Sequence, residues 1–165
     1  MREVDEFVPA AEWVAAIRPL LEQGHLLKIS PSGNSMQPLI AGGRDEVVLS
    51  SSVGKELKRG DIVLFSREDG TYVLHRIYKI KDNKYIINGD SQTWREGPVE
   101  PSCIVAVAES VIRRGREISC GNPGYRAFAD IWLFLRPVRP LFFGVLKTVY
   151  RLADRRTDDI KEKGT

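Results

Sequence analysis

Short runs of β-favouring residues alternate with turn pairs between Asp45 and Ile112, and this pattern limits the fold more than any other feature of the sequence. Valine, isoleucine, tyrosine and phenylalanine are common in the runs, and pairs such as Arg59-Gly60 separate them. The expected strands are 26–29, 46–49, 61–65, 71–80, 84–88 and 104–112. Strands of this length and spacing predict a compact, mainly β fold with mostly antiparallel strands.

Helical patterns flank the β region on both sides. Between residues 9 and 23 the apolar side chains recur at helical spacing, and after the turn at 121–124 the segments 125–135 and 141–152 are rich in large apolar residues. The chain therefore divides into an N-terminal helix (1–25), a β domain (26–120), an apolar and basic helical extension (121–156) and a charged tail (157–165).

Composition excludes several classes of function. A length of 165 residues fits one domain, and 25 basic against 22 acidic residues give a net charge of only +3, so we expect no nucleic-acid partner. Cys103 and Cys120 fit no metal-binding spacing, and we expect neither a metal nor another cofactor. The two thiols are either reduced or joined in a disulfide.

The N-terminus is acidic and is followed by no apolar run, so it does not resemble a secretory signal. The sequence also contains no uninterrupted apolar stretch of about 18 residues. We therefore expect a cytoplasmic protein. The arginine-flanked apolar runs of 125–152 leave three alternatives open: packing on the β domain, packing on a partner chain, or peripheral contact with a membrane.

Three stretches carry side chains suited to chemistry, and each also has an ordinary structural explanation. In 32–38, Ser35 sits in a turn flanked by glycine and proline, where it is either an exposed loop serine or a nucleophile beside converging N–H groups. In 72–78, strand alternation places His75 on one face with Val73 and Ile77, as a core histidine or as a base. In 87–92, Asp90 lies in a turn of the type that Asn, Gly and Asp favour.

Taken together, these stretches supply the parts of a nucleophilic site. A serine hydroxyl needs a base within hydrogen-bond reach, and imidazole suits that task near neutral pH. A carboxylate on the second ring nitrogen would fix the tautomer of the base. Ser35, His75 and Asp90 are the candidates for these three roles.

Four segments in order resemble the signature boxes of the type I signal peptidases, whose superfamily includes the self-cleaving domains of SOS-type repressors. These segments are Gly33-Asn34-Ser35-Met36-Gln37-Pro38, Lys58-Arg59-Gly60-Asp61-Ile62-Val63-Leu64-Phe65, His75-Arg76-Ile77 and Gly89-Asp90-Ser91. The resemblance covers roughly 26–112, about half the chain. It implies a coiled antiparallel β-sheet or barrel of the signal-peptidase type, with the serine at the end of an early strand. It also implies a serine endopeptidase that cleaves an extended peptide such as a leader or signal peptide. A histidine before Arg76-Ile77, where most bacterial members have lysine, resembles the archaeal and endoplasmic-reticulum branch.

The resemblance also implies roles for single residues. Ser35 would be the nucleophile, His75 the general base, and Asp90 its assistant. Met36 would line the substrate pocket, and the position of an oxyanion-donating serine in some relatives is Gly33 here, so that Ser32 or Asn34 would have to substitute. The residues expected to shape the motifs are Gly33, Pro38, Gly60, Asp61, Arg76 and Gly89, with Asp61 holding the start of a strand through turn hydrogen bonds.

The sequence departs from the family in lacking an apolar anchor before the serine box, which favours a soluble substrate such as the leader of a peptide precursor. One alternative is an inactive peptide-binding module of the same fold. A self-cleaving regulator is a weaker alternative, because only about 25 residues precede the first expected strand, too few for a DNA-binding domain. The oligomeric state stays open.

Overall fold

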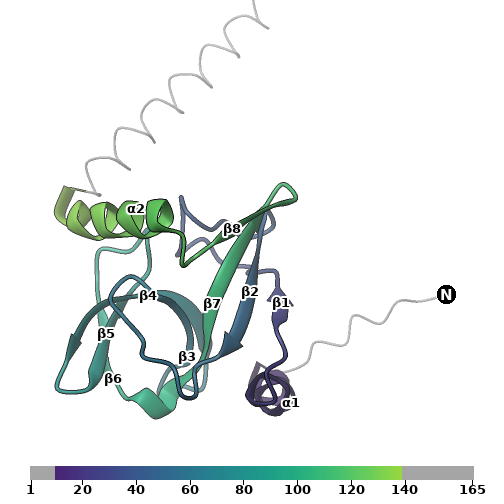
Figure 1. Ribbon diagram of the computed structural model, residues 1–165. Helices are drawn as coiled ribbons and strands as arrows, with labels where there is room; N and C mark the ends of the chain where they lie inside the picture. The colour runs from purple at the N-terminus through teal and green to yellow at the C-terminus, as the bar shows by residue number, and fades with distance from the viewer. Residues whose placement is uncertain (1–9, 139–165) are drawn as a thin grey trace, which may run out of the picture.

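The computed structural model describes residues 10–138, and these form eight strands and two α-helices (Figure 1). The strands are β1 (Leu27–Ile29), β2 (Asp45–Ser51), β3 (Ile62–Ser66), β4 (Tyr72–Lys81), β5 (Lys84–Asn88), β6 (Glu96–Val99), β7 (Ile104–Arg113) and β8 (Arg116–Ser119). The helices are α1 (Ala10–Glu22) and α2 (Pro123–Phe134), and single 3₁₀ turns occupy Pro101–Cys103 and Arg136–Val138.

All strands belong to one antiparallel sheet with the order β1-β2-β7-β3-β4-β5-β6, and β8 pairs with β7 off this path. Within the described residues β1 pairs only with β2, and β6 only with β5, so the sheet is not closed into a barrel. The mainly β prediction is therefore confirmed, and the sheet is an open one. The predicted N-terminal helix and the first helix of the C-terminal extension are also present, as α1 and α2.

Two hairpins in the sheet follow directly from their turn residues. Asp82 and Asn83 connect β4 to β5 with φ values of 51° and 56°, and Arg114 and Gly115 connect β7 to β8 with φ values of 50° and 76°. Two-residue loops with positive φ match the twist of the strands that they join, and Asn and Gly favour them. These hairpins fix the register of the paired strands.

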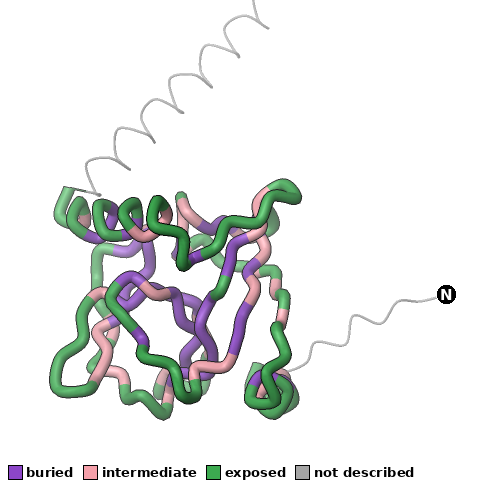
Figure 2. The backbone as a smooth tube through the Cα atoms, in the orientation of Figure 1, coloured by how far each residue is buried: buried purple, intermediate pink, exposed green. Residues whose placement is uncertain are grey.

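The core has two parts, one on each side of the central strand β3. Ile62 and Leu64 of β3 point into a first cluster with α1, β2 and β7, whereas Val63 and Phe65 point into a second cluster with β4 and β5. One cluster covers each face of β3, so residues Ile62 to Phe65 are all buried (Figure 2). Burial on both faces explains why its sequence is continuously apolar.

The helix α2 lies across the end of the sheet opposite to α1 (Figure 1). Asn122 caps it by accepting hydrogen bonds from the amides of Gly124 and Tyr125. Its inner side buries Trp132 and Leu133, and an outer group of apolar residues is exposed: Phe128, Ile131, Phe134 and Leu135. In the described part of the chain no helix has the length and apolar character needed to cross a membrane. The predicted helix 141–152 and the tail 157–165 lie outside the described residues.

Two strands, β6 and β8, are absent from the strands expected from the sequence. β6 has the sequence Glu-Gly-Pro-Val, and Pro and Gly argue against a strand except at a sheet edge, which is where β6 lies. Gly97 has a φ of 117°, and a Cβ there would lie 2.6 Å from the carbonyl oxygen of Tyr85 on β5. All four residues of β8 are exposed, so this strand has no buried face to give an alternating pattern.

Candidate active site

Ser35 lies in the turn that follows β1, and the turn after β5 holds its backbone in place. The amide and the hydroxyl of Ser91 both donate to the carbonyl oxygen of Ser35, at 2.8 and 3.0 Å. A Cβ at Gly89 would lie 2.8 Å from that same oxygen, so only glycine permits this close approach. The Gly-Asp-Ser segment thus positions the serine turn through its backbone and the Ser91 hydroxyl.

A buried carboxylate fixes the other end of the serine turn. Asp45, at the start of β2, accepts hydrogen bonds from the amide of Ala41 and from the guanidinium groups of Arg44 and Arg113. Arg44 also donates to the carbonyl oxygen of Pro38 at 3.1 Å. Burial disfavours the charge on Asp45, but the two arginines and the Ala41 amide hold the pKa of its carboxyl well below the ordinary value.

His75 of β4 is in direct contact with the serine. Its Nε2 lies 2.9 Å from Oγ of Ser35, a distance for a hydrogen bond. The ring is almost completely buried, with its centroid 6.1 Å from that of Phe65. Val73 and Ile77 share the second core cluster with Phe65, so the predicted alternation along β4 is confirmed. Ser35 and His75, 40 residues apart in the sequence, are brought together by the fold.

The carboxylate beside the second ring nitrogen belongs to Glu96, at the start of β6. Its Oε1 lies 3.2 Å from Nδ1 of His75, and both of its oxygens accept hydrogen bonds of 2.6 Å from Arg67. The Nδ1–Oε1 contact has an ion-pair distance, but its direction is not aligned for a hydrogen bond. It is therefore a close electrostatic contact.

The environment shifts the pKa of both groups downward. Burial lowers the pKa of His75 below its ordinary value of 6.5, and the charge of Arg67 adds to this effect, against the opposing charges of Glu96 and Asp90. Burial by itself would raise the pKa of Glu96, but the hydrogen bonds from Arg67 and the nearby imidazole lower it. At neutral pH the pair is therefore a neutral imidazole beside a carboxylate.

Asp90 was the residue expected at this second nitrogen, and that expectation is wrong. Both oxygens of its carboxylate accept hydrogen bonds from Arg76, at 3.0 and 2.9 Å, and both side chains of this ion pair are fully buried. Arg76 alternates with His75 along β4 and so points to the other face of the strand. It also donates to the carbonyl oxygen of Gly60 and to the hydroxyl of Tyr125. Asp90 thus joins β4 to the serine-supporting turn and to α2.

Gly60 and Asp61, directly before β3, make contacts that support the fold rather than the candidate catalytic residues. Gly60 has a φ of 93°, and its amide donates to the carbonyl oxygen of Ile77. Asp61 accepts from the amide of Lys58 at 2.7 Å, as predicted for a residue that holds the start of a strand. It also pairs with Arg126 of α2 at 2.6 Å, a contact between segments 65 residues apart that no local pattern predicts. These two residues therefore anchor α2 as well as β3.

A cavity of about 350 Å³ opens next to Ser35. Its walls come from α1, from the segment after β1, from the serine turn and from β3 and β4: Trp13, Ile29, Ser30, Pro31, Ser32, Gly33, Ser35, Met36, Ile40, Leu64, Tyr72, Val73 and Leu74. Met36 and Ser32 are thus on the cavity wall, whereas the side chain of Asn34 accepts a hydrogen bond from Gln37 within the turn. A Cβ at Gly33 would meet no atom within 4 Å.

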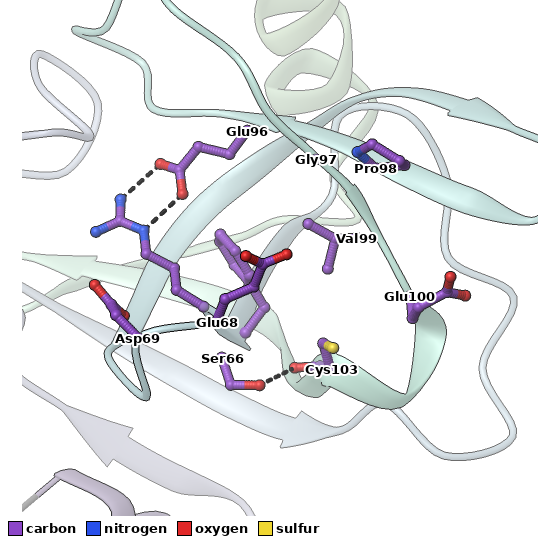
Figure 3. A pocket seen from close by; sticks show the side chains of 11 residues that line it. Ser66, Glu68, Asp69, Glu96, Gly97, Pro98, Val99, Glu100 and Cys103 are labelled. Carbon is purple, nitrogen blue, oxygen red and sulfur yellow. Dashed lines mark hydrogen bonds and ion pairs between the residues drawn. The ribbon is translucent and has the colours of Figure 1, made fainter.

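A second cavity, of about 650 Å³, is lined by Phe65, Arg67 and Glu96 but by neither Ser35 nor His75. Figure 3 shows Glu96 on its upper wall, with Val99 and Cys103 further along and Glu68 and Asp69 on the β3–β4 turn. Glu96 therefore touches His75 on one side and this cavity on the other. Cys103 and Cys120 are both free thiols.

The described residues include no group of three or more His, Cys, Asp or Glu side chains that could hold a metal ion. The arrangement of Ser35 and His75 can activate a hydroxyl. With a proton on Nδ1, the Nε2 of His75 is free to accept the proton of Ser35.

No protein-family model matches the sequence, and no curated protein is significantly similar to it.

Proposed function

We propose that the protein is a serine endopeptidase of the signal-peptidase type, with Ser35 as nucleophile and His75 as general base. The observation that carries the proposal is the 2.9 Å contact between Oγ of Ser35 and Nε2 of a buried imidazole whose pKa is lowered. A base of this kind is neutral at physiological pH and can accept the hydroxyl proton.

The reaction follows from this contact. Ser35 Oγ attacks the carbonyl carbon of the peptide bond while its proton moves to Nε2 of His75. The proton then passes to the leaving nitrogen as the C–N bond breaks, and an ester remains on Ser35. Water hydrolyses the ester, with His75 taking a proton from the water and returning it to Ser35. The amide of Ser35 is the donor for the developing oxyanion.

The substrate is an extended peptide bound beside β1. This strand pairs only with β2 among the described strands, and the segment that continues it, Ser30 to Gly33, lines the cavity next to Ser35. An open strand edge can accept a peptide as an additional strand. The cavity walls of Met36, Ile40 and Leu64 then receive apolar side chains next to the scissile bond. The leader of a peptide precursor has this chemistry.

The proposal is tested by comparing the peptide termini in cells that carry the wild-type protein or Ser35→Ala. We expect a set of internal cleavage sites to disappear in the variant, because removal of the nucleophile stops cleavage without changing the cavity. If the termini are the same in both strains while the variant retains the cellular function, the protein is instead a peptide-binding module.

A further inference from the structure

The proposed reaction needs the imidazole ring of His75 to keep Nε2 directed at Ser35 through each proton transfer. A histidine can carry its proton on either nitrogen, and only the Nδ1–H form leaves Nε2 free to accept. Nδ1 is buried and has no aligned hydrogen-bond partner among residues 10–138. Buried polar atoms are normally satisfied, so the group closest to Nδ1 is the one to consider.

We propose that Glu96, held by Arg67, is the positioning residue for His75, and this inference rests on the peptidase function proposed above. Oε1 of Glu96 lies 3.2 Å from Nδ1, whereas the carboxylate of Asp90 is bound to Arg76. The Glu96 carboxylate selects the Nδ1–H tautomer and stabilises the imidazolium that forms when Ser35 gives up its proton.

Arg67 is what makes a glutamate suitable for this position. A glutamate has three side-chain torsions and would move freely at a sheet edge, but two parallel hydrogen bonds from one guanidinium fix its plane. One of these bonds ends on Oε1, the same oxygen that faces Nδ1. As His75 gains charge, a small rotation of the ring aligns Nδ1–H with Oε1, because contacts that are loose in the free enzyme tighten in the transition state.

The charges around His75 make the effect of Glu96 measurable. The carboxylates of Glu96 and Asp90 favour the imidazolium, in that order, and Arg67 opposes it. Removing the charge of Glu96 leaves Arg67 in place and takes away the larger of the two favourable charges. The pKa of His75 should therefore fall further below its ordinary value in Glu96→Gln.

The experiment is NMR titration of the full chain with ¹⁵N-labelled histidine, of which the chain has only His25 and His75. In Glu96→Gln we expect the pKa of His75 to drop by about one unit, the usual minimum for loss of an opposite charge at this distance. Glu96→Asp should recover part of this shift. Glu68→Gln, an exposed carboxylate on the wall of the same second cavity, should leave the pKa of His75 unchanged. Equal pKa values in wild type and Glu96→Gln would overturn the proposal.

A second readout needs no variant. In the wild type above the pKa of His75, the ¹⁵N shifts should show the proton on Nδ1, and a neutral ring protonated on Nε2 would contradict the role of Glu96 even if the variants fail to fold. With a proteome-derived peptide library as substrate, Glu96→Gln should cleave about tenfold or more slowly at its plateau, with the acid limb at lower pH. Failure of the peptidase proposal is recognised separately, because the NMR measurements use no substrate and Ser35→Ala tests cleavage alone.

Discussion

At the scale of single residues, the most informative position is the one that departs from the resemblance. By the resemblance to the signal peptidases, Gly33 stands at a position where some of those enzymes have a serine that donates to the oxyanion. A Cβ at Gly33 would meet no atom within 4 Å. Its backbone has no positive φ that would exclude a side chain. Gly33 also lies on the wall of the cavity that contains Ser35. The position can therefore hold a serine without strain.

Gly33→Ser is predicted to increase cleavage of the peptide library, because a second hydroxyl donor at the oxyanion stabilises the transition state. Removing one such donor from an enzyme typically costs about a hundredfold or more, so a gain of about tenfold is a moderate expectation. The matched control is Gly33→Ala, which adds the Cβ without the hydroxyl and should not show the gain. Equal rates in the two variants would mean that residue 33 does not face the oxyanion.

Of the residues at the site, Ser35 and His75 could be predicted from the sequence, whereas Glu96 could not. Ser35 and His75 could be paired because each lies in a short, recognisable motif. Glu96 could not, because it belongs to a Gly-Pro segment that carries no strand signal, and its contact with His75 joins β6 to β4 across an intervening strand. The resemblance favours Asp90 because it is the carboxylate of the Gly-Asp motif, but a sequence does not reveal that a buried Arg76 requires its charge.

At the scale of elements, the serine turn depends on contacts that reach it from β2, β5 and β7. Asp45 at the start of β2 links the turn to Arg113 at the end of β7, and Ser91 supports it from the turn after β5. Alternation within β4 was predictable, since it is a local property of the chain. The links from Asp45 to Arg113 and from Ser91 to Ser35 were not predictable, because they join segments more than 50 residues apart.

Asp45→Asn is predicted to lower the free energy of unfolding by about 2 to 3 kcal/mol at neutral pH, because it removes the charge from a buried ion-pair group whose arginine partners are about one-third exposed. The folded-state pKa of Asp45 is lowered, so its contribution is complete above the unfolded-state pKa and is lost as the pH falls towards the folded-state value. Denaturant unfolding between about pH 7 and pH 2 should therefore show a steeper loss for wild type than for Asp45→Asn.

The control for that series is Asp82→Asn, which removes an exposed carboxylate from the β4–β5 turn. Its free energy of unfolding should stay within about 0.5 kcal/mol of the wild-type value. If Asp45→Asn lowers the free energy of unfolding by no more than Asp82→Asn, the contacts of Asp45 with Ala41, Arg44 and Arg113 do not contribute to stability.

At the scale of the whole molecule, three distant segments form the site: the turn after β1, the middle of β4 and the start of β6. The helix α2 braces this arrangement from the end of the sheet, through Arg126 on Asp61 and through the indole N–H of Trp132, which donates to the carbonyl oxygen of Asp90. The sequence left open whether the C-terminal apolar segment packs on the β domain. In α2 (123–134), one side of the helix packs on the β domain and the other side is exposed.

The most direct test of the central claim is the rate at which the purified full chain cleaves the peptide library, measured by mass spectrometry for the wild type and for Ser35→Ala. We expect new peptide termini with the wild type and a cleavage rate about a thousandfold or more lower in the variant, because no other group replaces the nucleophile. Equal cleavage by the two proteins would contradict the assignment of Ser35.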